Sequence, residues 1–230
     1  MRNESEVALA PRWHTTLLVL LLLSVALCGT LLQHYAGPRA VTPGPANDPI
    51  RSRYLPLLTV NAGLVLYTCR LFRTRNALPN LLGERWHSAT RAAVDLACAL
   101  LACVLIQGLE AAFVRHFGVG RNAAASALLP RTEAERLAWV LVAVSVGFCE
   151  EVVYRGYLQT QIAAFTGSVR WGVLLQAVLF GIAHAEQGLG SGLRIACYGM
   201  IFGVLAQLRR SLLPSIASHV IIDLVAGFWG

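Results

Sequence analysis

The chain is poor in charged residues and contains no lysine. Charged residues make up 13% of its 230 residues, and hydrophobic residues make up 56%. Soluble domains usually carry roughly 25% charged residues. This balance argues against an ordinary soluble domain and favours a protein of the membrane.

The net charge of +7 comes entirely from arginine on the basic side. The arginines are scattered between apolar segments and form no stripe with interleaved aromatic residues, which argues against a nucleic-acid binder. They fit instead as charges that flank membrane helices beside a lipid bilayer. The all-arginine set also favours a bacterial source, and we therefore expect the protein in the bacterial inner (cytoplasmic) membrane.

Several common site motifs are missing. The six cysteines form no CxxC pair, so neither a zinc ribbon nor a disulfide scaffold is indicated. HExxH is absent, which removes the usual single-helix zinc protease. No serine lies in a GxSxG pattern, so a serine-type protease is not indicated either. The cysteines fit as small apolar core residues.

Apolar segments of membrane-spanning length recur along the whole chain. A helix needs about 20 apolar residues to cross the hydrocarbon layer, and a spanning segment must satisfy its own backbone hydrogen bonds, which predicts helices. We predict an all-α, polytopic integral membrane bundle of about seven transmembrane helices. The predicted spans are 15–36, 54–72, 92–114, 137–157, 171–185, 193–208 and 212–229, of which the fifth and sixth are short.

The chain reads as one membrane domain. We expect an N-terminal tail over 1–14, N-terminal membrane helices without a recognised motif over 15–130, and a core over 131–230 that contains charged and histidine-bearing segments. The linker 37–49 is rich in proline and glycine, and 71–91 is a polar connector with a short interfacial helix. The first span resembles a signal peptide in its basic start, but no clear cleavage site closes it, so we expect a retained helix.

The stretch GFCEEVVYRG, residues 147–156, places charges inside an apolar run. Each such charge costs about 2.5 to 3.5 kcal/mol on membrane-insertion scales, so intramembrane charges usually pair or mark function. Glu151 and Arg155 are four residues apart, which predicts an ion pair on one helix face. Glu150 points about 100° away and lacks that partner. A capping-box pattern at Thr132 and Glu135 predicts that this helix begins near Glu133.

Two later apolar segments carry histidines. Phe180 and His184 are four residues apart, and so are His219 and Asp223. A carboxylate and an imidazole in a dry pocket can act as general bases toward water, and a second histidine can stabilise an oxyanion. Glu, His and His could also bind zinc. For Asp95 and Glu110, also in an apolar span, interior hydrogen bonding or helix packing is the expectation.

EEVVYRG (150–156), FGIAH (180–184) and HVIID (219–223) together resemble the EExxxR, FxxxH and HxxxN/D motifs of the CAAX protease and bacteriocin-processing family of intramembrane proteases. The resemblance covers about 75 residues in three apolar segments. It implies that Glu150 and His184 activate the attacking water. It also implies that His219 and Asp223 stabilise the oxyanion, and that Glu151, Arg155 and Phe180 support the site.

The resemblance leaves two questions open, the role of Asp223 and the need for a metal. Asp223 stands where asparagine is common in the family, and it could instead hold the ring of His219. Members have been described as metal-dependent and as glutamic-type. We expect no cofactor, with zinc or another divalent metal as the alternative, because no compact metal-ligand spacing appears.

The function that follows is an intramembrane endopeptidase acting on a membrane-anchored protein or peptide. The substrate itself does not follow from the motifs; a C-terminal tail or sorting signal is one possibility. The main alternative is a non-catalytic immunity, scaffold or escort protein with the same fold. A proton-coupled transporter is a third reading, for which no inverted repeat or broken helix pair is visible.

Overall fold

A computed structural model describes residues 8–36, 48–70, 77–120 and 123–229, and these residues fold into helices joined by short connections. The longer helices are α1 (Arg12–Ala36), α2 (Leu55–Arg70), α4 (Ala89–Phe117), α6 (Glu133–Glu150), α8 (Val169–Ile182), α9 (Leu189–Arg209) and α10 (Leu213–Trp229). The shorter helices are α3 (Ala77–Leu82), α5 (Ala123–Leu128) and α7 (Gln159–Thr166). Two π-helical segments, Ile50–Tyr54 and Glu151–Leu158, and one 3₁₀ turn, Ala185–Gln187, complete the described elements.

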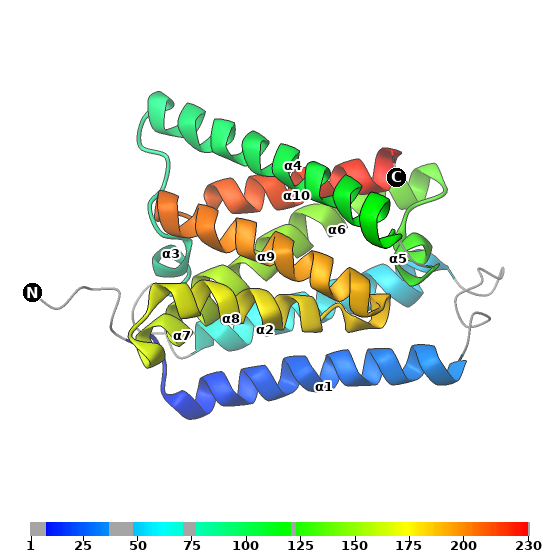
Figure 1. Cartoon of the computed structure of the whole chain (residues 1–230), viewed down its shortest axis with the longest axis horizontal. Coiled ribbons are helices and arrows are strands. Elements are labelled where there is room, and N and C mark those ends of the chain that lie inside the picture. Colours follow the sequence, from blue (N-terminus) through cyan, green and yellow to red (C-terminus); the bar gives the residue numbers. More distant parts are fainter. Residues whose placement is uncertain (1–7, 37–47, 71–76, 121–122, 230) are drawn as a thin grey trace, which may run out of the picture.

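The helices form one bundle, and each predicted span overlaps one of the longer helices, so the all-α membrane fold is confirmed. In Figure 1, α1 and α4 lie along opposite edges of the bundle, and α9 runs between them. The linker 37–49 falls almost wholly outside the described residues. The connector 71–91 contains α3, the short helix expected there. The expectation that the first span is retained stays a prediction.

The described helices are long enough for a multi-pass membrane protein. By length and composition, four segments can cross a bilayer: Arg12–Leu32, Ala89–Phe117, Glu133–Thr166 and Leu189–Arg209. The helices α8 and α10 are apolar but shorter. The count of seven transmembrane helices stays a prediction. The sixth span is not short, because α9 has 21 residues.

The fourth predicted span was wrong at its C-terminal end. We expected it to stop at residue 157, yet helical structure continues to Thr166. The residues beyond 157 include Gln159 and Gln161, which look like the start of a polar loop. Both are buried, and both donate hydrogen bonds to other elements: Gln159 to the Gly203 carbonyl of α9, and Gln161 to the Ala10 carbonyl before α1. These hydrogen bonds to other elements satisfy the two polar side chains inside the protein.

Two glycines set how closely the helices approach. A Cβ atom on Gly147 of α6 would lie 2.8 Å from Cγ2 and 3.2 Å from the backbone nitrogen of Val220 on α10. A Cβ atom on Gly181 of α8 would lie 2.4 Å from the Gly192 carbonyl oxygen of α9. Neither position can take a larger side chain without movement, and both helix pairs carry candidate site residues.

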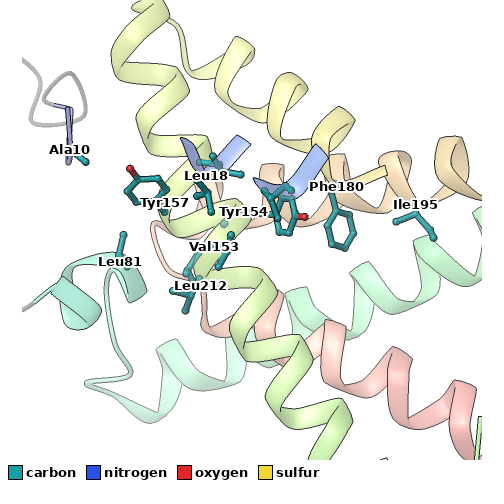
Figure 2. Packing of buried hydrophobic residues seen from close by; sticks show 13 residues of the cluster. Ala10, Leu18, Leu81, Val153, Tyr154, Tyr157, Phe180, Ile195 and Leu212 are labelled. Carbon is teal, nitrogen blue, oxygen red and sulfur yellow. The ribbon is translucent and has the colours of Figure 1, made fainter. Parts of the chain in front are cut away.

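The main hydrophobic core surrounds the π-helical segment Glu151–Leu158. Figure 2 shows its side chains Val153, Tyr154 and Tyr157 packed among residues from several other elements. Those residues include Leu18, Leu81, Phe180, Ile195 and Leu212. The motif stretch is thus the centre of the bundle, which fixes the position of its charged side chains.

Candidate active site

The helix that carries the two glutamates begins as predicted. Thr132 is the N-cap of α6, and its hydroxyl accepts a hydrogen bond from the Glu135 backbone N–H at 3.2 Å. The Glu135 carboxylate accepts from the backbone N–H of Arg131 at 2.8 Å. After Glu150, the last residue of α6, the backbone becomes π-helical. Such wide turns are frequent at functional sites because they redirect neighbouring side chains.

Glu151 is the centre of a buried polar triad. Its Oε1 accepts from Arg155 Nη1 at 2.8 Å, which confirms the predicted ion pair, and both side chains are 0% exposed. The same Oε1 pairs with His219 Nδ1 at 2.9 Å. Glu151 therefore holds the His219 ring by a hydrogen bond at Nδ1, and Asp223 lies 3.8 Å from Nε2 of the same ring. Sequence spacing missed this contact because the two residues lie 68 positions apart.

Aromatic rings surround the remaining faces of the triad. The Arg155 guanidinium lies 4.2 Å from the centroid of Phe180 and 5.1 Å from that of Phe202. Phe202 also stacks on the His219 ring, with centroids 5.1 Å apart and planes inclined by 16°. Phe180 thus contacts the triad, and its supporting role stays a prediction. Phe202 is an additional contact that no sequence signal marked, since it lies in an ordinary apolar run of α9.

His184 follows the C-terminal end of α8 and is held by its own helix. Its Nδ1 lies 2.8 Å from the Phe180 carbonyl oxygen. Because a carbonyl only accepts, Nδ1 carries the proton in this contact, and Nε2 of the neutral ring keeps its lone pair. The Phe180 ring packs edge-on against His184, with centroids 4.9 Å apart. The imidazole therefore presents a basic nitrogen.

The predicted residues meet at one cavity of about 590 Å³. Its lining includes Glu150, His184, His219 and Asp223. Glu150 Oε2 lies 3.7 Å from His219 Nε2, and Asp223 Oδ2 lies 3.8 Å from the same nitrogen. These distances exceed a normal hydrogen bond but leave no room for another atom in between, so the two carboxylates act on the ring through their charge. Glu151 and Arg155 are fully buried and do not line the cavity.

The carboxylates of α4 have partners that the sequence did not suggest. Asp95 Oδ1 accepts from Arg209 Nε at 2.6 Å, and its Oδ2 accepts from Trp86 Nε1 at 3.0 Å. Glu110 lines the cavity, and its Oε1 accepts from Arg194 Nη1 at 2.6 Å. The expectation of interior hydrogen bonding holds for both, but Glu110 is also a cavity residue.

A metal site needs several donor side chains gathered around one point. Across the described ranges, no group of three or more His, Cys, Asp or Glu side chains is arranged to hold a metal ion. The side chains of Glu150, His184 and His219 are therefore not arranged as zinc ligands in this structure. That the enzyme needs no metal stays a prediction.

Comparison with known proteins adds a family to this geometry. Residues 132–225 match the family model described as type II CAAX prenyl endopeptidase Rce1-like. The match agrees with the resemblance of the three motifs to the CAAX protease family. The matched segment contains all three motifs, and the family is one of proteases in membranes. No curated protein and no solved structure matches the chain.

Proposed function

We propose that this protein is a glutamic-type intramembrane endopeptidase, which hydrolyses a peptide bond of a membrane-anchored protein or peptide with water activated by Glu150 and His184. The observation that supports this proposal is the shared cavity, which brings Glu150, His184 and His219 together from three different helical segments. Trimming of a C-terminal tail or sorting signal in a bacterial inner membrane is the setting we propose.

The first step is attack by water. Glu150 and the free Nε2 of His184 act as general bases toward a water molecule in the cavity. The water oxygen forms a bond to the scissile carbonyl carbon, one proton passes to the base, and the carbonyl oxygen becomes an oxyanion. Collapse of this intermediate breaks the C–N bond, and the retained proton passes to the leaving amine.

His219 stabilises the oxyanion in this scheme. Its Nδ1 is occupied by Glu151 at 2.9 Å, so donation from Nε2 requires the imidazolium form, which has an N–H on both nitrogens. The carboxylates of Glu150 and Asp223, at 3.7 and 3.8 Å from Nε2, offset that positive charge. Asp223 thus acts on His219 through its negative charge, and it donates no proton to the oxyanion in this scheme.

The proposal is tested with Glu150→Gln and His184→Ala in purified enzyme. Loss of a general base typically costs about 10²- to 10⁴-fold in rate, so we expect a fall of that size in substrate cleavage with the thermal unfolding midpoint unchanged. Glu133→Gln is the matched control, because Glu133 lies exposed in the first turn of the same helix. Full activity in both site variants would contradict the proposal, and an intact cellular phenotype in Glu150→Gln would favour the non-catalytic alternative.

Metal independence has its own measurement. We expect no stoichiometric metal by mass spectrometry of the purified protein, and unchanged cleavage after chelation. Activity that disappears with a chelator and returns with one divalent metal would replace the glutamic-type mechanism with a metal-assisted one.

A further inference from the structure

We propose that Glu110 forms a specificity subsite for a basic side chain of the substrate, three or four residues from the scissile bond. This inference rests on the proposed protease function and names the class of substrate sequence that the cavity accepts. It concerns residues outside the three motifs.

Glu110 is a carboxylate held in place at the cavity wall. Arg194 Nη1 donates to its Oε1 at 2.6 Å, and the Tyr198 hydroxyl donates to its Oε2. The Glu110 side chain is nevertheless 30% exposed, whereas the Arg194 side chain is 5% exposed. Both side chains line the cavity, and the carboxylate is the more exposed of the two. Such a fixed acceptor recognises a cation by a charge-assisted hydrogen bond.

The charges around the cavity favour a basic ligand. Among the described residues that line it, four are acidic and one is an arginine: Glu110, Glu150, Glu186 and Asp223 against Arg194. An anionic side chain would meet repulsion from this wall, whereas lysine or arginine would be attracted. The balance stays acidic when His219 is in its imidazolium form, because its charge and that of Arg194 then face four carboxylates.

Arg194 adds a second requirement. Its Nε is buried and has no hydrogen-bond partner among the described residues, although Arg194 lines the cavity. A buried donor without a partner is costly, and a carbonyl oxygen would satisfy it. A ligand with a cation near a carbonyl matches Glu110 and Arg194 together, and a basic residue within a peptide has that composition.

Two helices give the distance from the reacting centre. On α4, Cys103 Sγ donates to the carbonyl of Ser218, the neighbour of His219, at 3.6 Å. Glu110 lies seven residues further along, which is about 10 Å at a rise of 1.5 Å per residue. On α9, Phe202 stacks on His219, and Arg194 lies eight residues earlier, or about 12 Å away. An extended peptide covers these lengths with three or four residues.

The test uses peptides with an apolar segment of about 20 residues and a polar flank, in detergent micelles. Each flank position carries lysine or the uncharged isostere norleucine. At the third or fourth position from the cleaved bond, we expect kcat/KM to be about tenfold higher for the lysine peptide than for the norleucine peptide, as suits a hydrogen bond to a charged group. At the other positions, the lysine-to-norleucine ratio should be smaller. Glu110→Gln should bring the lysine-to-norleucine ratio close to one, and Tyr198→Phe should lower it partly.

Asp95→Asn is the matched control, because it removes a paired carboxylate from the same helix away from the cavity. The ratio should stay at its wild-type value there, and it does not depend on the folded fraction of any variant. A ratio that is flat across positions in wild type, or unaltered by Glu110→Gln, would overturn the subsite while leaving the protease function intact.

A binding experiment separates the two proposals. The Glu150→Gln enzyme should bind the fluorescent lysine peptide about tenfold more tightly than the norleucine peptide, and adding Glu110→Gln should abolish the difference. If this preference appears in a protein whose wild-type form cleaves no peptide, the subsite stands and the protease proposal falls. Equal binding of both peptides overturns the subsite.

Discussion

At the scale of single residues, Glu151 connects the parts of the site. One of its oxygens meets Arg155 and His219, and the carboxylate has no exposure to solvent. Removal of one partner from a buried ion pair typically costs about 3 to 5 kcal/mol, because the other charge stays buried and unpaired. The pair thus anchors His219 in the core, whereas Glu150 lies at the cavity.

Phe202 is a positioning residue in this arrangement, because it acts on His219 by stacking. Phe202→Leu keeps an apolar side chain but removes the flat face. We expect kcat to fall by about 10- to 100-fold, since small misplacement of a reacting group has effects of that size, with KM little changed. Steady-state kinetics with one cleavable peptide measures both constants.

Met200→Leu is the control for that variant, because Met200 is on the same helix and 42% exposed. Phe202→Tyr or Phe202→Trp, which restore a ring, should recover part of kcat. A higher KM and a lower kcat, together with a lower unfolding midpoint, would mean that Phe202 only fills space.

At the scale of elements, the site depends on how closely α6 and α10 pack. Gly147 lies one turn before Glu150, and its partner Val220 is next to His219. The same helix pair is also joined by Trp139, whose Nε1 donates to the Asp223 carbonyl at 2.9 Å. The distance between Glu150 and His219 is therefore set by these interhelical contacts.

Gly147→Ala should push the two helices apart. Overpacking of this kind costs about 1 to 3 kcal/mol, so we expect a lower unfolding midpoint and a marked loss of cleavage. Gly108→Ala is the control, because a Cβ there meets nothing within 4 Å, and alanine is the better helix former. Its stability should be equal or higher. Unchanged activity in Gly147→Ala would show that the site tolerates the wider spacing.

Element boundaries were predictable only where local signals set them. The Thr132 cap gave the start of α6 within one residue, since a cap is a contact between neighbours. The end at Thr166 was missed, because Gln159 and Gln161 are satisfied by α9 and by the segment before α1.

At the scale of the whole molecule, the outer helices present apolar side chains to their surroundings. On α1 these include Leu17, Leu20, Leu21, Leu27 and Leu32, all more than two-fifths exposed. In water such a surface would be an aggregation hazard, whereas in a bilayer it meets lipid. Cys28 lies on this helix, is exposed, and falls within the segment Arg12–Leu32.

Cys28 gives a test of this orientation toward lipid. With Cys28 as the single cysteine, a water-soluble maleimide should not label the protein in native membranes, because the reagent does not enter the hydrocarbon layer. It should label the protein after unfolding in detergent. The control carries Ser52→Cys as its single cysteine, at an exposed position outside the candidate spans, and should react at once. Rapid labelling of Cys28 in membranes would show that this face of α1 meets water.

The sequence by itself determined the helical membrane bundle and the pairing of Glu151 with Arg155. Both follow from hydrophobic length and helical pitch, which act between residues close along the chain. Only the tertiary structure decided that Glu151 also holds His219, that Phe202 stacks on that ring, and that Arg194 fixes Glu110 beside the cavity. These contacts join residues from different helices, and helix periodicity leaves the order in which helices pack undetermined.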